Sequence, residues 1–185
     1  MKKRSTLPKK IIGKYYQKGS PLYELLVTHS KLVASLAVDI AEKHPSWEID
    51  KTFLYEAAML HDIGIYLTDA PSIGCHGPHP YIQHGVIGAE ILRKEGLDMH
   101  ALVCERHTGV GLTLQEIVSR DLPLPAREMV PVSLEEQIIC YADCFYSKSG
   151  DPEEKRSVER IIASLAKRSE DQVRKFRAWH TLFEQ

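Results

Sequence analysis

Six histidine and aspartate side chains have the types and spacing needed for metal coordination. They are spread over five segments of the chain: His29, His61, Asp62, His84, His107 and Asp143. Each lies in line with the apolar residues of its segment when that segment is drawn as a helix, so each is predicted to face a core. A single buried histidine is ordinary, but six buried polar groups without partners would each cost about 1–3 kcal/mol. A shared metal ion would satisfy them together.

The adjacent pair His61–Asp62 is the most informative of these positions. It follows an apolar run over residues 53–60, and Gly64 comes two residues later, which is typical of a helix end. Side chains of adjacent helical residues point about 100° apart, but in a last turn both can contact one ion. Gly64 is therefore predicted to end the helix and to leave the pair facing the mouth of a helix bundle.

The elements that position these residues are all predicted to be helical, so the fold class is all-α. Ser20 and Pro21 favour a helix start, and the apolar stripe that follows places His29 on the buried face. Further helices are predicted over residues 50–63, 81–95 and 98–108, from Thr113 and Ser133, and from Asp151 with a break near Ser169. Residues 67–80, rich in Gly, Pro and His, are predicted to form a surface loop.

The composition indicates one domain without a strong overall electrostatic field. The chain has 185 residues, with 24 Lys and Arg against 25 Asp and Glu, so its net charge does not attract it to nucleic acids or anionic membranes. Its start is basic but lacks the apolar core of a secretory signal, and no run reaches membrane-spanning length. The four scattered cysteines favour a reducing compartment, so a cytoplasmic location is expected.

Three regions are predicted along the chain. Residues 1–19 form a basic tail, solvated or in contact with phosphates; residues 20–150 form the metal-binding domain; residues 151–185 form a helical extension packed on that domain. The extension carries mixed charges around an apolar stripe, which favours packing on the domain over binding of nucleic acid. The same stripe could instead form the interface of a homodimer. Cys140 and Cys144 could join a soft-metal site but are expected to be small core residues.

Four of the six positions also carry a resemblance to a known family. His29, His61–Asp62 and Asp143 resemble the H…HD…D signature of the HD-domain superfamily of metal-dependent phosphohydrolases, and HDIG at residues 61–64 is the form used by its HDIG subgroup. The stretches HGVIGAEILRKEGL, CERHTGVGL and VPVSLEEQIICYAD resemble a small family of stand-alone HDIG-related domains. The resemblance runs from about residue 20 to residue 148 and implies a bundle of about five core helices, with C-terminal helices added to it.

The resemblance implies one or two divalent metal ions. The first would be held by His29, His61, Asp62 and Asp143, and the second by His84 and His107, with Asp62 as the bridge. These nitrogen and oxygen ligands suit Fe, Mn, Co, Ni or Zn and do not choose among them. The segment of residues 70–80 is longer and richer in His than this small family leads one to expect. The resemblance therefore does not predict which residues form the substrate pocket.

The chemistry that follows is hydrolysis of a small phosphate ester, a nucleotide or a related phosphorylated metabolite. Asp62 or Asp143 would orient a water or take its proton, and His84 and His107 would assist the leaving group. Four further side chains are candidates for contacting the substrate: Arg106, Lys148, His76 and His79. For each of these four, an ordinary surface or loop residue is the competing interpretation.

Two other functions use the same residues. Some HD-domain proteins are mixed-valent di-iron oxygenases, and their six-ligand arrangement is the one that these histidines and aspartates could make. A non-catalytic regulatory module with the metal as a structural clamp is the third hypothesis. It fits less well, because a structural site closes its coordination sphere, whereas two ions that share six ligands leave positions open.

Overall fold

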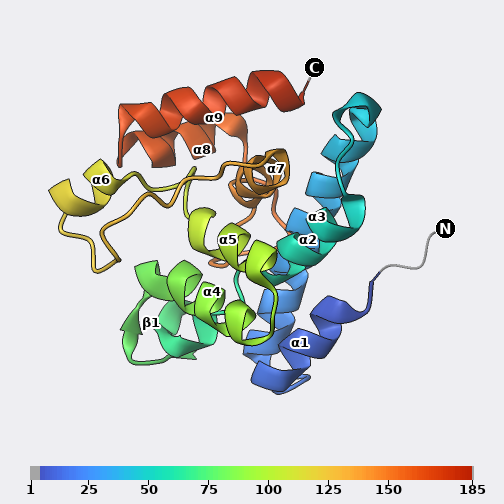
Figure 1. Ribbon diagram of the computed structural model, residues 1–185. Coiled ribbons are helices and arrows are strands. Elements are labelled where there is room, and N and C mark those ends of the chain that lie inside the picture. Colours follow the sequence, from blue (N-terminus) through green and yellow to red (C-terminus); the bar gives the residue numbers. More distant parts are fainter. Residues whose placement is uncertain (1–4, 185) are drawn as a thin grey trace.

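The computed structural model describes residues 5–184 and is built around five packed helices (Figure 1). In the described residues, the α-helices are α1 Leu7–Tyr15, α2 Pro21–Lys43, α3 Lys51–Leu60, α4 His84–Lys94, α5 Asp98–Arg106, α6 Leu114–Ser119, α7 Leu134–Asp143, α8 Val158–Ala166 and α9 Glu170–Phe183. Short 3-10 turns cover Pro45–Trp47, Ile65–Leu67, Pro71–Ile73 and Tyr81–Gln83. The helical fold class is confirmed.

The longest α-helix of the described residues is α2, with 23 residues. The Ser20 hydroxyl accepts a hydrogen bond from the Tyr23 amide at 3.2 Å, and Pro21 occupies the first turn, as the sequence predicts. Its buried stripe packs along α3 and α7, while α4 packs on α5. These five helices, α2, α3, α4, α5 and α7, are the elements that carry the predicted ligands.

The N-terminal segment corrects the expectation of a solvated tail. Residues 7–15 form α1, in which Ile11 and Ile12 are buried, and the buried Tyr16 directly follows the helix. The Tyr16 hydroxyl donates to the Ile63 carbonyl at 2.8 Å, just after the His61–Asp62 pair. The apolar side chains of this segment outweigh its lysines, which lie on the opposite, exposed face. Residues 1–4 of the predicted tail lie outside the described residues.

The segment predicted as a loop contains a small sheet. Strands β1 (Thr68–Ala70), β2 (Cys75–His76) and β3 (His79–Pro80) form a sheet in the order β2-β1-β3. Asp69 pairs with His76 in antiparallel fashion, and Thr68 pairs with His79 in parallel. Strands of two or three residues leave no alternating pattern for sequence analysis to detect.

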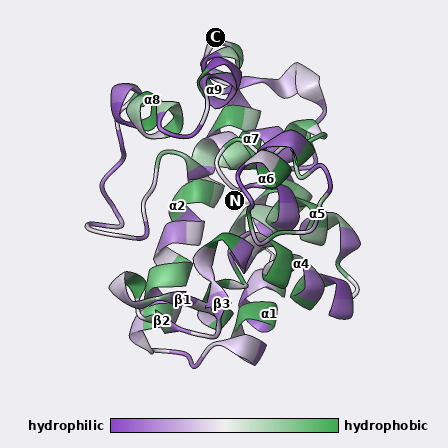
Figure 2. Ribbon diagram, turned by 90° about the vertical axis from the view of Figure 1, so that its left-hand side faces the viewer, coloured by the Kyte–Doolittle hydropathy of each residue, from purple (hydrophilic) through white to green (hydrophobic). Residues whose placement is uncertain are grey.

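The C-terminal helices pack at the opposite end from this sheet, as both views show (Figures 1 and 2). The rings of Phe176 on α9 and Tyr141 on α7 are stacked with centroids 5.4 Å apart. Residues 151–157 are not helical, contrary to the prediction, because the capping serine is Ser157, whose side chain accepts from the Arg160 amide. The break at Ser169 is confirmed.

The connection between α7 and α8 is hydrophilic along much of its length (Figure 2). Within residues 5–184, no helix combines the length and the apolar character that a membrane span requires.

Candidate metal centre

The six predicted ligands converge in the interior of the bundle as two groups that share Asp62. One group is His29, His61, Asp62 and Asp143, and the other is Asp62, His84 and His107; within each group the ligand atoms lie within 4.8 Å of one another. His29 comes from the middle of α2, His61 and Asp62 directly follow α3, and the remaining three come from an end of α4, α5 and α7. The fold therefore brings together every metal ligand that the sequence suggests.

Gly64 has a different role from the one predicted. Helix α3 already ends at Leu60, and Gly64 has an ordinary φ of −83°, so it does not act as a left-handed terminator. A Cβ at this position would lie 2.3 Å from the His84 carbonyl oxygen and 2.5 Å from the Gly88 nitrogen. Gly64 is needed because the chain after His61–Asp62 touches the backbone of α4, and this contact carries His84 to the centre.

Three of the histidines are held in one tautomer by backbone carbonyls. The Nδ1 atoms of His61, His84 and His107 donate to the carbonyls of Ala58 (2.6 Å), Tyr81 (2.7 Å) and Cys104 (2.7 Å). A carbonyl can only accept, so each Nδ1 carries the proton, and in the neutral ring each Nε2 directs a lone pair into the centre. Such backbone bonds are the usual means of orienting a metal-binding imidazole.

The Nε2 atoms meet at distances that favour a cation between them. His84 Nε2 lies 3.0 Å from His107 Nε2. Burial lowers the pKa of His84 to about 3 despite the opposing charge of Asp62, so His84 is neutral. Because its Nδ1 donates to Tyr81, its Nε2 lone pair points at His107 Nε2, and a cation shared by the two Nε2 atoms would fit this geometry.

Asp62 divides its two oxygens between the two groups. Oδ2 lies 3.2 Å from His29 Nε2 and 3.1 Å from His61 Nε2. Oδ1 lies 3.5 Å from His84 Nε2 and 3.4 Å from His107 Nε2. Both oxygens are fully buried, and neither accepts a hydrogen bond of good geometry from the described residues. A bridging carboxylate has this arrangement, so the residues present fit a metal centre.

Buried charges keep both carboxylates ionised. Burial alone would raise the pKa of Asp62, but the positive charges of Lys148 and His61 lower it well below its usual range. Lys148 has the same effect on Asp143, again against burial. Burial lowers and the charge of Asp62 raises the pKa of His61, which reaches about 10 in the protein without metal. The His61 proton thus sits where an ion would bind, and the two compete.

Of the four candidates for contacting the substrate, Lys148 lies beside the predicted ligands. Its ammonium lies 2.6 Å from Asp62 Oδ2 and 4.0 Å from Asp143 Oδ1. Tyr81 was not predicted, and its ring stacks on His84 with centroids 4.7 Å apart. Tyr81 begins the helix predicted over residues 81–95, but in the structure it lies in the 3-10 turn Tyr81–Gln83, and nothing in the sequence marks it as part of the centre.

The other three candidates lie away from the ligands. Arg106 points to Glu136, whose two carboxylate oxygens are 3.0 and 3.1 Å from its Nη1, so its guanidinium is engaged elsewhere. His76 and His79 are exposed residues of β2 and β3 and belong to neither ligand group.

The cysteines of the core do not join the centre. Cys140 and Cys144 are buried, and their thiols donate to backbone carbonyls, that of Cys140 to His107 at 3.1 Å and that of Cys144 to Gly109 at 3.3 Å. Burial raises the pKa of both thiols, so they remain protonated. Their expected role as small core residues is confirmed.

Comparisons with known proteins agree with this geometry. The family model described as HD domain matches residues 26–148. An uncharacterised protein of Methanocaldococcus jannaschii is 39% identical over 123 residues, which are 65% of this chain and 65% of that protein. No solved structure gave a significant match.

Two longer relatives carry a functional name. They are tRNA (cytidine(56)-2′-O)-methyltransferases of Picrophilus torridus, 34% identical over 65% of this chain, and Thermoplasma volcanium, 35% identical over 71%. The chain spans 31% and 34% of their lengths, so their names describe proteins of which it matches one part. HD domains are in general metal-dependent hydrolases. With the family match covering most of the chain and the His–Asp cluster in place, this chain belongs to the HD domain family.

Proposed function

We propose that this chain is a metal-dependent phosphohydrolase that cleaves a small phosphate ester, a nucleotide or a related phosphorylated metabolite. The observation that carries the proposal is Asp62, whose two buried oxygens face two separate ligand groups. Two ions bound this way would be held by His29, His61 and Asp143 on one side and by His84 and His107 on the other. When bound, they would polarise a phosphoryl oxygen and lower the pKa of a water.

The protein's own side chains supply the remaining functions. Asp143 is the most exposed of the six ligands, with 16% of its side chain accessible against at most 5% for the others, so it lies nearest to an entering substrate. Its carboxylate can accept a proton from the attacking water. Lys148, 12% exposed, can turn from Asp62 to the negative charge of a phosphoryl group.

An activity screen tests this proposal directly. The protein loaded in turn with Mn²⁺, Co²⁺, Ni²⁺, Zn²⁺ or Fe²⁺ is assayed for phosphate release from nucleoside monophosphates, cyclic nucleotides, sugar phosphates and RNA with terminal phosphates. The RNA substrates are included because tRNA appears in the names of two relatives. We expect at least one phosphate ester to be hydrolysed in a metal-dependent reaction.

Two variants test whether activity depends on the metal centre or only on an intact core. Asp62→Asn should lower kcat/KM by more than the roughly 100-fold that loss of an outer-sphere partner costs, because both ligand groups lose a charged member. His100→Gln is the matched control: His100 is also buried, but it pairs with Glu56 at 3.3 Å, outside the centre, and its loss should leave the activity unchanged.

A di-iron oxygenase is the second candidate, because the same six side chains provide its ligand set. Oxygen uptake by the iron-loaded protein, without phosphate release from any ester, would contradict the phosphohydrolase and support this alternative. Bound metal with neither reaction, together with tight binding of a small molecule, would support the non-catalytic module.

A further inference from the structure

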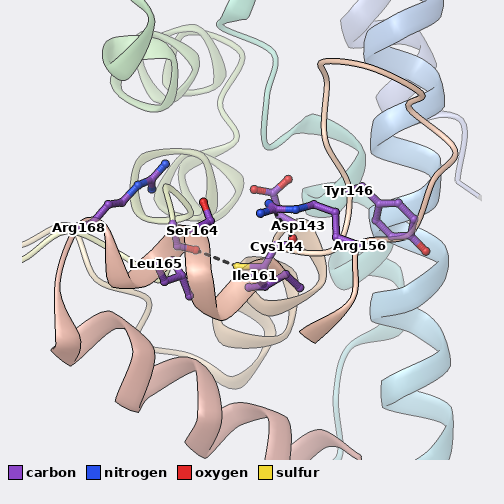
Figure 3. A pocket seen from close by; sticks show the side chains of 9 residues that line it. Asp143, Cys144, Tyr146, Arg156, Ile161, Ser164, Leu165 and Arg168 are labelled. Carbon is purple, nitrogen blue, oxygen red and sulfur yellow. Dashed lines mark hydrogen bonds between the residues drawn. The ribbon is translucent and has the colours of Figure 1, made fainter. Parts of the chain in front are cut away.

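A small cavity adjoins the one partly open ligand, Asp143. Its volume is about 120 Å³, well above the roughly 10–15 Å³ that one water needs. Its lining includes Asp143 and Cys144 at the end of α7 and, as a second group, Arg156, Ser164 and Arg168 (Figure 3). The residues of the second group come from the extension that follows the region matched by the family model, which ends at residue 148. The extension therefore forms a wall of the cavity beside Asp143.

The two arginines of this wall lack the acidic partners that neighbouring arginines have. Arg160 pairs with Glu154 at 2.7 Å, whereas neither Arg156 nor Arg168 has a carboxylate within 4.0 Å among residues 5–184. Arg156 is held by backbone carbonyls only, through Nη1 to Cys144 and Nη2 to Arg160, both at 3.4 Å. Most guanidinium donors around the cavity are consequently free to bind something else.

Glycine at position 109 makes room for the second arginine. A Cβ on Gly109 would lie 3.0 Å from Arg168 Nη1, and its φ of +66° is in the left-handed region. Gly109 follows the ligand His107 by two residues and also lines the cavity. The backbone just after a metal ligand is thus shaped so that a guanidinium from the extension can lie over it.

The side chains point into the shared space. In Figure 3, the guanidinium groups of Arg156 and Arg168 and the hydroxyl of Ser164 are directed toward the region beside the Asp143 carboxylate. Two planar guanidinium groups and a hydroxyl offer several donors to a tetrahedral anion, and arginine favours bidentate contacts with phosphate. A neutral ligand would leave both cations without a partner.

We propose that this cavity is the subsite for the phosphoryl group of the substrate, held by Arg156, Arg168 and Ser164. The inference rests on the proposed phosphohydrolase activity. It adds that the phosphate ester enters the site from the side of the C-terminal extension. Residues 151–184 are then part of the active site, and the HD-matched region alone lacks its anion-binding wall.

Binding of inorganic phosphate tests the subsite without turnover. The metal-loaded protein is titrated with phosphate by calorimetry, as wild type and as Arg156→Ala, Arg168→Ala and Arg160→Ala. We expect the dissociation constant to rise about tenfold or more in the first two variants, which is about 1.4 kcal/mol or more. Arg160→Ala is the matched control, since Arg160 is already paired with Glu154, and it should bind phosphate like the wild type.

Two further measurements separate a lost contact from a lost fold. Melting temperature and metal content are measured for every variant, and Arg156→Lys, which keeps the charge, should bind phosphate more tightly than Arg156→Ala. Equal phosphate affinity in the wild type, Arg156→Ala and Arg168→Ala would overturn the subsite, as would a wild type that does not bind phosphate at 10-millimolar levels, roughly the weakest range worth measuring.

The outcomes also distinguish the subsite from the proposed function. If phosphate binding depends on both arginines but no ester is hydrolysed, the anion subsite stands and the phosphohydrolase assignment fails. If an ester is hydrolysed and the two arginine variants change neither KM nor phosphate affinity, the phosphohydrolase stands and the subsite fails.

Discussion

The core contains buried carboxylates of two kinds, and their surroundings differ in one respect. Glu105 is held by Arg93 and Arg127, each 2.6 Å from one of its oxygens, and Glu136 is held by Arg106 and the Val132 amide. Asp62 is more deeply buried and faces four imidazole nitrogens, but it has no hydrogen bond of good geometry. The glutamates are paired with arginines, whereas Asp62 has one cation, the Lys148 ammonium 2.6 Å from Oδ2, and its Oδ1 faces only imidazole nitrogens.

This difference indicates that the paired glutamates contribute to folding, whereas Asp62 contributes to metal binding. A carboxylate paired with arginine gains its stabilisation on folding, and nothing further is needed. A buried carboxylate whose oxygens lack hydrogen bonds of good geometry costs free energy that an ion can later recover. We therefore expect removal of the Glu105 carboxylate to affect folding without affecting metal binding, and removal of the Asp62 carboxylate to do the reverse.

The largest effect on the fold is expected where the centre is assembled. Gly64→Ala would place a methyl group against the backbone of α4. This clash can be relieved only if α4 moves and His84 moves with it. We expect the free energy of unfolding to fall by about 3 kcal/mol and the second metal site to weaken. Urea denaturation and metal titration measure the two effects.

Gly13→Ala is the control for this substitution. Gly13 lies in α1, and nothing would lie within 4 Å of an added Cβ. Alanine is a better helix former than glycine by up to about 1 kcal/mol, so this variant should be as stable as the wild type or more so. Equal loss of stability in both glycine variants would contradict the close-approach argument.

The next effect is stabilisation by the metal. A ligand at 100 times its dissociation constant stabilises the folded state by about 2.7 kcal/mol, which raises the melting temperature of a chain of this size by roughly 5–10 °C. We expect Mn²⁺ to shift the melting temperature of the wild type and of His100→Gln in this way. A similar shift in Asp62→Asn would show that the ion binds elsewhere.

The smallest effect concerns the satisfied carboxylate and depends on pH. Burial opposes ionisation of Glu105, but its bonds to Arg93 and Arg127 lower its pKa below the usual range. A lowered pKa stabilises the folded state above the pKa of the unfolded chain, near 4.3, and the stabilisation disappears as the pH falls through the folded value. Because both arginines are partly exposed, we expect about 1.5 kcal/mol at pH 7.

Glu105→Gln measures this contribution. In the metal-free protein, the variant should be less stable than the wild type at pH 7, and the difference should shrink toward pH 3. Its metal content at pH 7 should equal that of the wild type. Reduced metal content would contradict the expectation that Glu105 serves folding and does not serve metal binding.

Helical periodicity was enough to predict that the six side chains come together, since each lies in register with an apolar stripe and the bundle brings those stripes together. It was not enough for Arg106: its neighbour His107 faces the centre, but successive helical residues point in different directions, and Arg106 faces Glu136. Arg156 and Arg168 could not be predicted as partners, because only the packing of the extension on the bundle brings them to one cavity.

We propose that two metal sites share Asp62, and a metal count tests this sharing most directly. Elemental analysis of the reconstituted protein should give two ions per chain for the wild type, one for His84→Ala, and none for Asp62→Ala. Two ions in His84→Ala, or full metal content in Asp62→Ala, would contradict the shared site.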